Sequence, residues 1–460
     1  MLDKLIKWIR GVINKMFNKS ELKRHFNVSV NISDKMAENI ELWNKLFENQ
    51  APWLSDTVKS LNLAASIANE VARLVTLELE SEITGSKRAD YLNEIYQTFL
   101  SNIESDTEYA CAGGGTIFKP YVKNNTIAIE TVQATRFTPT EFDTTGKLIG
   151  AIFAVQKIIG STYYTRLEYQ RFENKEYVID NLAFKSTNKE VLGEQILLTD
   201  VDEWANISPR VSIKDLEKPL FSYFKMPFAN QIERSSHLGV SIYSRAIDLI
   251  KEADKQYSRI LWEYEGSELA IDADVTALTT NKATQKLGLP SLNNRLFRNV
   301  GMQNKDGNFY NVFSPTIRDE SLFNGLDKLL KKIEFVCGLA YGTISDPANV
   351  DKTATEIKQS KQRSYATVCK IQSALQTALE DLIYALDSLA SLYGLAPVGN
   401  YETSYKWDDS IIVDADEERE RDLQDVRMGI MSKEEFRAKW YGETIEQARQ
   451  NLPKEADVIE

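Results

Sequence analysis

Cysteine and histidine are both scarce in this chain of 460 residues. Its cysteines are Cys111, Cys337 and Cys369, and its histidines are His25 and His237. The cysteines are odd in number and far apart, which is the pattern of neither a disulfide framework nor a zinc site. No histidine stands in a cluster with cysteine or carboxylate in the sequence. The common nucleophile–base pairs and metal sites therefore lack the residues that they require. We therefore expect no enzymatic activity, no cofactor and no metal, and the cysteine content fits a reducing cytoplasm.

Long apolar runs are also missing. No run reaches the roughly 18 residues that a membrane-spanning helix needs. Residues 1–19 are interrupted by Lys4, Lys7, Arg10 and Lys15, so they lack the apolar centre of a signal peptide. Their apolar residues fall on one helical face instead. The segment is either an arm that packs on its own chain or on a neighbour, which we favour, or a basic amphipathic helix on a membrane surface.

Positive charge is in the minority. Lys and Arg total 55 against 67 Asp and Glu, which gives a net charge of −12. Such a chain is a poor non-specific DNA binder, because DNA affinity comes mostly from cations that neutralise phosphates. A hydrophobic fraction of 43%, with 20 Tyr and 19 Phe, is enough for a core. The length allows two to four domains.

The first half of the chain changes from helical to β-rich. Residues 1–105 repeat apolar residues at spacings of three and four, which is typical of amphipathic helices. Residues 108–235 contain strand-like runs such as "NTIAIETV", "LIGAIFAV" and "KEYVIDNLAF", separated by turn signals. The glycines at 113–115 lack the Lys-Ser/Thr pair of a phosphate loop, so we interpret them as a tight turn or a strand entry.

Two helices and an irregular insert follow. An apolar stripe predicts a helix over 238–265, about 40 Å long. Residues 267–320 break the helical pattern, and Asp306-Gly307 within "NVGMQNKDGNFYNVF" indicates a hairpin. A second helix resumes at about residue 320 and is expected to end near Gly342.

The stretch "DPANVDKTATEIKQSKQRSY" at 346–365 changes from turn residues to a charged helix. Thr353 and Glu356 form a T-x-x-E capping box, so a helix should begin at about Ala354. Apolar steps of three or four then continue for about 40 residues, which predicts a long packing seam. The first half of this helix carries three cations: Lys358, Lys361 and Arg363.

The tail, residues 411–460, is polar and charge-dense. Two further capping-box spacings, Ser432 with Glu435 and Thr444 with Gln447, predict short helices there.

Several other residues have a plain structural interpretation. Asp272 and Asp274 have no third ligand in sequence, which favours solvated loop charge over a cation site. His237 precedes a helix and has no partner motif, which favours capping or packing. Cys337 and Cys369 lie on apolar helical stripes and are expected in the core.

The order of these segments resembles the portal (head–tail connector) proteins of tailed bacteriophages, particularly those of siphophages of Gram-positive hosts. Four stretches carry the resemblance: "GGGTIFKPYVKNNTIAIETVQATRFTPTEFDTTGKLIGAIF", "KPLFSYFKMPFANQIERSSHLGVSIYSRAIDLIKEADKQYSRILWE", "DKTATEI" and "GIMSKEEFRAKWYGETIEQA". Their order and spacing extend over most of the chain. The first hundred residues and residues 267–320 match least.

The resemblance implies an α+β, mainly α, phage portal fold and a homo-dodecameric ring at one capsid vertex. It implies these parts: residues 1–236, an N-terminal helical arm and α/β wing; 237–266, the first stem helix; 267–319, the clip; 320–342, the second stem helix; 343–353, the tunnel loop; 354–410, a long wing helix and return segment; and 411–460, the crown. The ring would be a channel for genome packaging and ejection, located in the virion after assembly in the host cytoplasm. Implied partners are the terminase, head-completion and adaptor proteins, major capsid and scaffolding proteins, and double-stranded DNA.

The resemblance also implies a DNA-facing tunnel loop made of Asp346, Pro347, Ala348, Asn349, Val350, Asp351 and Lys352. Lys352, Lys358 and Lys361 lie at the loop exit and on the charged start of the helix, so they are candidates for transient phosphate contacts. An acidic wall suits such a conduit, because a channel must release what it binds.

Ring closure needs two different faces of each subunit. Apolar residues of the first stem helix are candidates for this interface: Ile242, Tyr243, Ile247, Ile250, Tyr257 and Leu261.

Two other functions stay open. One is a hydrolase that uses paired carboxylates, although nothing in the sequence distinguishes two carboxylates from the rest. The other is a peripheral membrane or helical scaffold protein that uses the basic amphipathic N-terminus. For residues 346–352, composition alone favours an ordinary connector between helices, and only the resemblance favours a tunnel loop.

Overall fold

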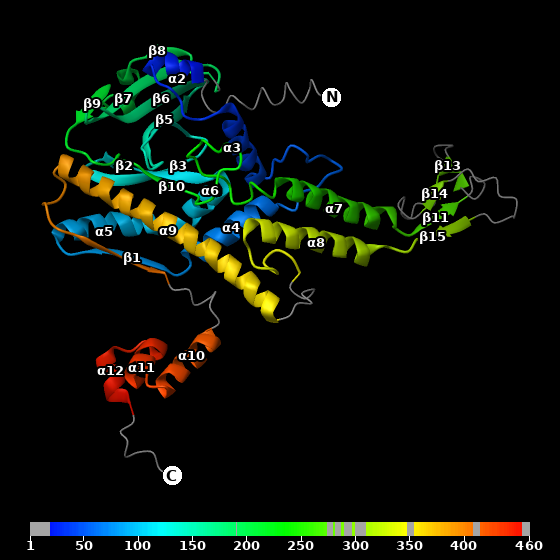
Figure 1. Ribbon diagram of the computed structural model, residues 1–460. Helices are drawn as coiled ribbons and strands as arrows, with labels where there is room; N and C mark the ends of the chain where they lie inside the picture. The colour runs from blue at the N-terminus through cyan, green and yellow to red at the C-terminus, as the bar shows by residue number, and fades with distance from the viewer. Residues whose placement is uncertain are drawn as a thin grey trace, which may run out of the picture.

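The computed structural model describes residues 19–189, 191–273, 279–280, 287–288, 297–299, 310–346, 354–407 and 415–452. Figure 1 shows a body of helices and sheets, from which a pair of helices projects toward a small group of strands. Three short helices lie at the C-terminal end (Figure 1). The fold is mixed α and β, as the sequence predicts.

Helices dominate residues 19–113, as expected, with one short strand among them. The Ser33 side chain caps α3 by accepting a hydrogen bond from the Met36 amide, and Ser86 caps α5 in the same way. The apolar faces of these helices supply much of the main core. The elements are α2 (Lys19–Phe26), α3 (Asp34–Phe47), α4 (Leu63–Thr76), β1 (Leu79–Thr84), α5 (Lys87–Leu100) and α6 (Ile103–Gly113).

A six-stranded antiparallel sheet forms the upper lobe in Figure 1, where the sequence predicted strands. Helix α2 lies on this lobe, where Leu22 is buried in one cluster with Ile152 and Phe184. The strands run in the order β4-β5-β6-β7-β8, with β9 also paired to β7. Their bounds are β4 (Phe137–Phe142), β5 (Leu148–Ile159), β6 (Thr162–Glu173), β7 (Glu176–Ser186), β8 (Glu194–Ile196) and β9 (Arg210–Ile213).

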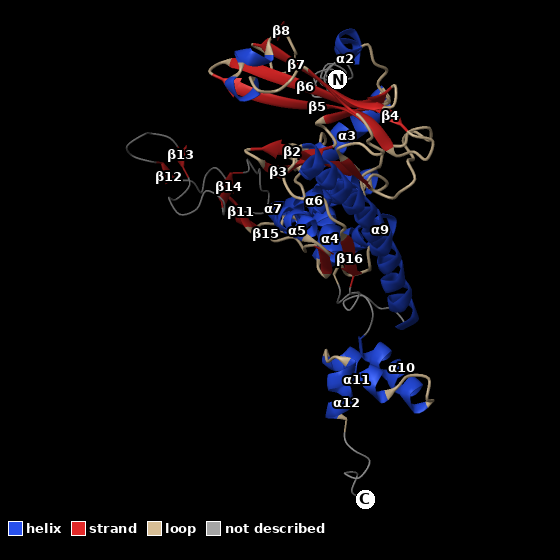
Figure 2. Cartoon of the chain, turned by 90° about the vertical axis from the view of Figure 1, so that its left-hand side faces the viewer, coloured by secondary structure: helices blue, strands red, loops and turns tan. Residues whose placement is uncertain are grey.

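A smaller sheet, β10-β2-β3, lies between this lobe and the helices (Figure 2). It consists of β2 (Gly115–Lys123), β3 (Thr126–Gln133) and β10 (Ser222–Lys225). A buried ion pair joins the two sheets, because the Lys119 ammonium lies 3.3 Å from the Glu168 carboxylate. Burial alone would raise the pKa of Glu168, but Lys119 and Arg166 hold that pKa below its ordinary value.

The glycines at 113–115 are a helix end and a strand entry, which confirms the prediction. Gly114 adopts a left-handed conformation (φ 88°) after α6, and β2 begins at Gly115. A side chain at Gly239 would meet the Gly114 carbonyl oxygen at 2.0 Å, so these two backbones touch. His237 packs on the Phe142 ring, with the ring centroids 5.4 Å apart, which confirms its packing role.

The first projecting helix, α7 (Ile247–Gly266), begins nine residues later than predicted. The segment before it is held in turns, because the Ile242 amide donates to the carbonyl of Cys111 on α6. The close approach of Gly239 to the body fixes the same segment. Tertiary contacts therefore override a helical apolar pattern over 238–246.

The second projecting helix, α8 (Asp319–Cys337), lies beside α7 (Figure 1). The Arg318 guanidinium binds both oxygens of the Glu263 carboxylate, at 3.0 and 2.8 Å, and holds the pKa of Glu263 below its usual value. Helix α8 ends before the expected Gly342, because Gly338 turns the chain with a φ of 76°. Cys337 is buried, as predicted, and burial raises the pKa of its thiol to about 12.

The hairpin predicted around Asp306-Gly307 lies outside the described residues and stays a prediction. Both β14 (Phe297–Asn299) and β15 (Tyr310–Phe313) pair with β11 (Ala270–Ala273), on opposite sides of it, and not with each other. A two-stranded pair, β12 (Thr279–Thr280) and β13 (Leu287–Gly288), completes the described part of this region.

Helix α9 (Ala354–Leu392) crosses the body, and at 39 residues it is about 58 Å long. It begins at the residue that the capping-box spacing predicted. Its second half is buried in the main core, whereas Cys369 on its first half is only half-buried. The chain then returns as β16 (Glu402–Trp407), which pairs with β1.

The tail forms three helices, α10 (Ala415–Arg427), α11 (Lys433–Tyr441) and α12 (Ile445–Asn451). Both predicted capping boxes are confirmed. Ser432 and Thr444 accept from the backbone amides of Glu435 and Gln447, whose side chains accept from the capping residues in return.

One buried arginine ties α5 to the far end of α9. Arg88, 1% exposed, donates to the Asp387 carboxylate at 2.7 Å and to the Ala396 carbonyl at 2.8 Å. It also donates to the Asp387 carbonyl and to the Ser391 hydroxyl. This cluster fixes the C-terminal end of the long helix against the N-terminal helices.

We expect Arg88→Ala to lower the free energy of unfolding by about 3 kcal/mol, because it removes a buried side chain that makes four hydrogen bonds to the end of α9 and the segment after it. Urea unfolding followed by tryptophan fluorescence measures the change. Arg73→Ala is the matched control, since Arg73 is 43% exposed and pairs with Glu70 along one helix; its expected effect is about 0.5 kcal/mol. Equal effects of the two substitutions would contradict this role of Arg88.

Candidate functional site

The candidate site is the turn that joins α8 to α9, just before the predicted tunnel loop. The structure describes this turn up to Asp346, which is exposed. Its amide donates to the Asp327 carboxylate of α8 at 3.1 Å. The loop residues 347–353 lie outside the described residues, and the structural description therefore concerns the base of the loop.

Glu334 organises this base. Its side chain comes from the last turn of α8 and is fully buried. One carboxylate oxygen accepts from the amides of Gly342, Ile344 and Ser345, at 3.1, 2.7 and 2.9 Å, and the other accepts from the Ser345 hydroxyl at 2.9 Å. Three backbone amides and one hydroxyl thus satisfy the acceptors of this buried side chain. The acceptor is fixed on a helix, so it fixes the path of the chain into the loop.

Arg363 fastens the start of α9 to the same turn. Its guanidinium lies over the rings of Phe335 and Tyr341, 4.6 and 5.0 Å from their centroids, and donates to the Leu339 carbonyl at 3.3 Å. From the sequence, Arg363 was expected on a solvent-exposed, charged surface in the first half of this helix. The structure shows it half-buried in a cation–π contact with the end of α8.

Close packing at Gly338 completes the junction. A side chain at this position would meet the Thr367 hydroxyl of α9 at 2.5 Å, so only glycine lets the two helices approach in this way. The entrance and the exit of the loop are thus attached to one rigid unit.

The predicted DNA-facing residues are only partly described. Lys361 is exposed on α9, where a phosphate could reach it. Lys352 and Thr353 lie outside the described residues. Glu356 and Lys358 belong to α9, but their side chains are not described. The tunnel-loop, capping and phosphate-contact roles of these residues therefore remain predictions.

Half of the predicted ring-interface residues are already buried within one chain. Ile242, Tyr243 and Ile250 are 5%, 0% and 3% exposed, and the Tyr243 hydroxyl donates to the Trp43 carbonyl at 2.8 Å. These three residues stabilise the fold of the subunit, which corrects the sequence-based assignment. The remaining three, Ile247, Tyr257 and Leu261, are half-buried, and their interface role stays a prediction.

Other apolar residues of the two projecting helices are exposed, and sequence analysis missed them. Trp262 and Tyr264 on α7 are 66% and 42% exposed, and Phe323 on α8 is 47% exposed. Residues two apart on a helix point about 200° from each other, so Trp262 and Tyr264 lie on nearly opposite sides of α7. For Trp262 the signal was available in the sequence, because it falls outside the main apolar stripe of that helix, whereas Tyr264 continues the stripe.

The root of the projecting pair is fixed by Asp254 of α7. Its carboxylate accepts from the Trp53 indole and from the Leu61 amide, both at 2.8 Å. Burial raises the pKa of Asp254 above its ordinary value, against the opposing effect of these two donors. The loop between α3 and α4 therefore orients the helices that carry the candidate site.

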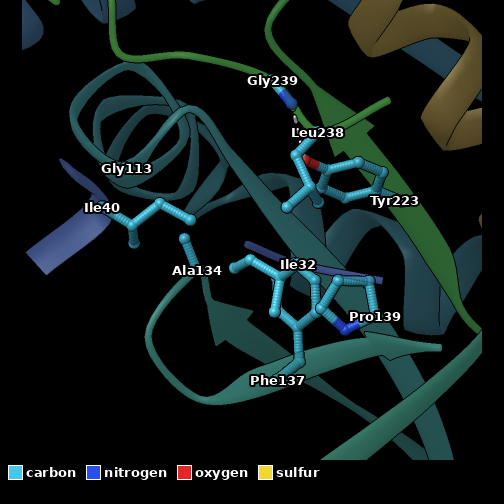
Figure 3. Close-up of a pocket in the computed structure, with 9 residues that line it drawn as sticks. All are labelled: Ile32, Ile40, Gly113, Ala134, Phe137, Pro139, Tyr223, Leu238 and Gly239. Carbon is cyan, nitrogen blue, oxygen red and sulfur yellow. Dashed lines mark hydrogen bonds between the residues drawn. The ribbon is translucent and has the colours of Figure 1, made fainter. Parts of the chain in front are cut away.

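An open hollow of about 700 Å³ lies on the surface formed by β1, α5 and β16. One apolar cavity of about 10 Å³ is just large enough for a water molecule. Figure 3 shows its lining residues: Ile32, Ile40, Gly113, Ala134, Phe137, Pro139, Tyr223, Leu238 and Gly239. The described residues contain no group of three or more potential metal ligands. None of the described helices is long and apolar enough to cross a membrane.

We predict that Glu334→Ala releases the turn before the loop, because three backbone amides lose their charged acceptor. Amide exchange in a peptide that spans 339–346 should become about 100-fold faster, as expected for the loss of hydrogen bonds to a charged group. Hydrogen-exchange mass spectrometry measures this. Glu320→Ala, at an exposed position of the same helix, should leave the exchange unchanged. Unchanged exchange in Glu334→Ala would refute this role.

Comparison with known proteins identifies the family of this chain. The family described as "Phage portal protein, SPP1 Gp6-like" matches residues 44–456. One solved structure to which this chain is similar is titled "Neck of empty GTA particle computed with C6 symmetry". It shares 11% sequence identity and a TM-score of 0.45, over 90% of this chain and 94% of that chain. The search of curated proteins gives no match. The chain belongs to the phage portal proteins of the SPP1 Gp6-like family.

Proposed function

We propose that this portal protein forms a dodecameric ring at one vertex of a phage capsid. The ring is the channel through which the terminase packages the genome and through which the DNA later leaves. It is also the platform on which the head–tail adaptors dock. Family membership supports this function, and the surface of the stem, defined here as α7 and α8, supports the ring.

The observation that carries the proposal is the exposed apolar surface of the stem. Trp262 and Tyr264 lie on nearly opposite sides of α7 and leave large aromatic surfaces open. A ring of identical subunits uses two different faces of each copy, which meet at a heterologous interface. Exposed aromatic residues on both sides of one helix fit this arrangement better than they fit an isolated monomer.

The parts of the chain suggest where each partner binds. The strands between α7 and α8 form the clip, at the end of the stem farthest from the body (Figure 1), where the terminase and the adaptors have free access. The helices α10–α12 form the crown. The six-stranded sheet and the smaller β10-β2-β3 sheet form the wing. Major capsid and scaffolding proteins contact the outside of the ring. The assembled ring resides in the virion, after assembly in the host cytoplasm.

Electrostatics suit a channel for DNA. Each subunit has a net charge of −12, so a ring of them repels the DNA overall. A few cations near the channel, such as Lys352, Lys358 and Lys361, give weak and salt-dependent contacts with phosphates. The DNA is therefore guided but not trapped.

The stem interface leads to a test of assembly. Trp262→Asp combined with Phe323→Asp should prevent ring formation, because a charge on each exposed aromatic position opposes its burial between subunits. Native mass spectrometry measures the loss of rings. Circular dichroism should show an unchanged fold, since both side chains are exposed in the subunit. Ile158→Asp, at an exposed position on β5, is the control that should still assemble. Normal rings in the double variant would contradict the stem interface.

The loop leads to a test of DNA passage. Deletion of residues 346–351 should leave ring assembly largely intact but impair DNA packaging or retention, because the base formed by Glu334 and Arg363 remains. A replacement of the same six residues by Gly and Ser separates the effect of loop length from that of loop composition. DNA protected from nuclease in assembled particles measures packaging. Failed assembly, with normal packaging by any ring that does form, would exclude the tunnel-loop assignment.

A further inference from the structure

The outer face of α8 carries an unusual distribution of charge. Five residues at spacings of three and four are exposed along one stripe: Ser321, Asn324, Lys328, Lys332 and Phe335. The opposite side contains the residues that pack into the protein: Leu326, Ile333, Glu334 and Cys337. The stripe therefore points away from the core and is available to a partner.

The carboxylates of α8 are all placed away from Lys328 and Lys332. Asp319 and Glu320 lie in the first turn, where their negative charges interact favourably with the positive end of the helix dipole. Asp327 pairs with Lys331 at 2.6 Å, and Glu334 is buried against the turn before the loop. Among the described residues, no carboxylate lies within ion-pair distance of the Lys328 or Lys332 ammonium.

The companion helix differs. On α7 the Lys255 ammonium pairs with Glu252 at 2.7 Å, and Asp248 is exposed one turn before Glu252. The exposed surface of α7 is thus mixed in sign, whereas the only charged members of the α8 stripe are the cations Lys328 and Lys332. The chain has a net charge of −12, so two exposed lysines one turn apart, neither with a carboxylate within ion-pair distance among the described residues, stand out against its acidic surface.

The stripe also leads to the candidate site. Lys328 and Lys332 are separated by about 6 Å along the helix axis, a little more than one turn. The next exposed member, Phe335, supports the Arg363 guanidinium at the start of α9. Figure 1 shows α8 running from the clip strands to the turn before the loop. The cations therefore follow one line from the stem to the base of the loop.

We infer that the outer stripe of α8 faces the channel and that Lys328 and Lys332 contact phosphates of the passing DNA. This inference rests on the proposed ring. In the ring, the two lysines of each subunit form two belts of cations about 6 Å apart. A lysine ammonium is a compact, strongly hydrated charge on a flexible stem, so it exchanges phosphates easily. Ser321 and Asn324 extend the stripe with neutral polar groups that add little attraction.

Photo-crosslinking in assembled, DNA-filled particles tests which face of the stem meets the DNA. A benzophenone amino acid at position 324 should crosslink to the packaged DNA, whereas the same group at position 251 on α7 should not. Ring formation and packaging are scored in the same particles. If rings form and package DNA but the crosslink arises from position 251, or from neither, the inference is overturned while the proposed function stands. If the wild-type chain forms no ring, both fail.

The salt dependence of DNA binding by purified rings provides the second readout. Lys328→Gln with Lys332→Gln should reduce the slope of log affinity against log salt by at least about 0.9, the value for one phosphate contact on duplex DNA. Lys251→Gln with Lys255→Gln removes the same charge at the same spacing on α7 and should leave the slope unchanged. An equal reduction in both pairs, or none in the α8 pair, would overturn the assignment of the phosphate contacts to α8.

Discussion

The buried Glu334 carboxylate is the contact on which the candidate site depends. It binds three amides and a hydroxyl of the turn that follows its own helix, so the end of α8 and the entrance of the loop form one unit. Arg363 attaches the start of α9 to the same turn. In the proposed channel, a loop that contacts moving DNA must resist the pull on it. Two charged side chains whose positions are set by helices would supply this resistance.

The long helix transmits this attachment to the rest of the body. Its far end is held by Arg88, and its middle is buried in the main core. The root of the stem is held separately, by Asp254 and the loop before α4. The described subunit thus has a fixed frame, while its stem leaves aromatic surfaces open on two sides. A rigid subunit with this exposed stem surface fits the proposed ring, in which neighbouring subunits would cover the aromatic residues.

Local signals made much of the fold predictable from sequence. The capping boxes at Ser432 and Thr444 were read correctly because all their partners lie within three residues. The pairing of β14 and β15 on either side of β11 was not predicted, because β11 is distant from both strands in sequence. The role of Glu334 could not be predicted for the same reason, because its hydrogen bonds depend on a turn that folds back over the helix. Sequence could identify the family and the helix start at Ala354, but not which residues support the loop.

The central claim is that identical subunits close into a ring around a channel. Class-averaged electron microscopy of the purified full-length chain tests it most directly. The account predicts circular particles with twelve-fold symmetry and a central opening. A strictly monomeric or dimeric protein under all assembly conditions would contradict it.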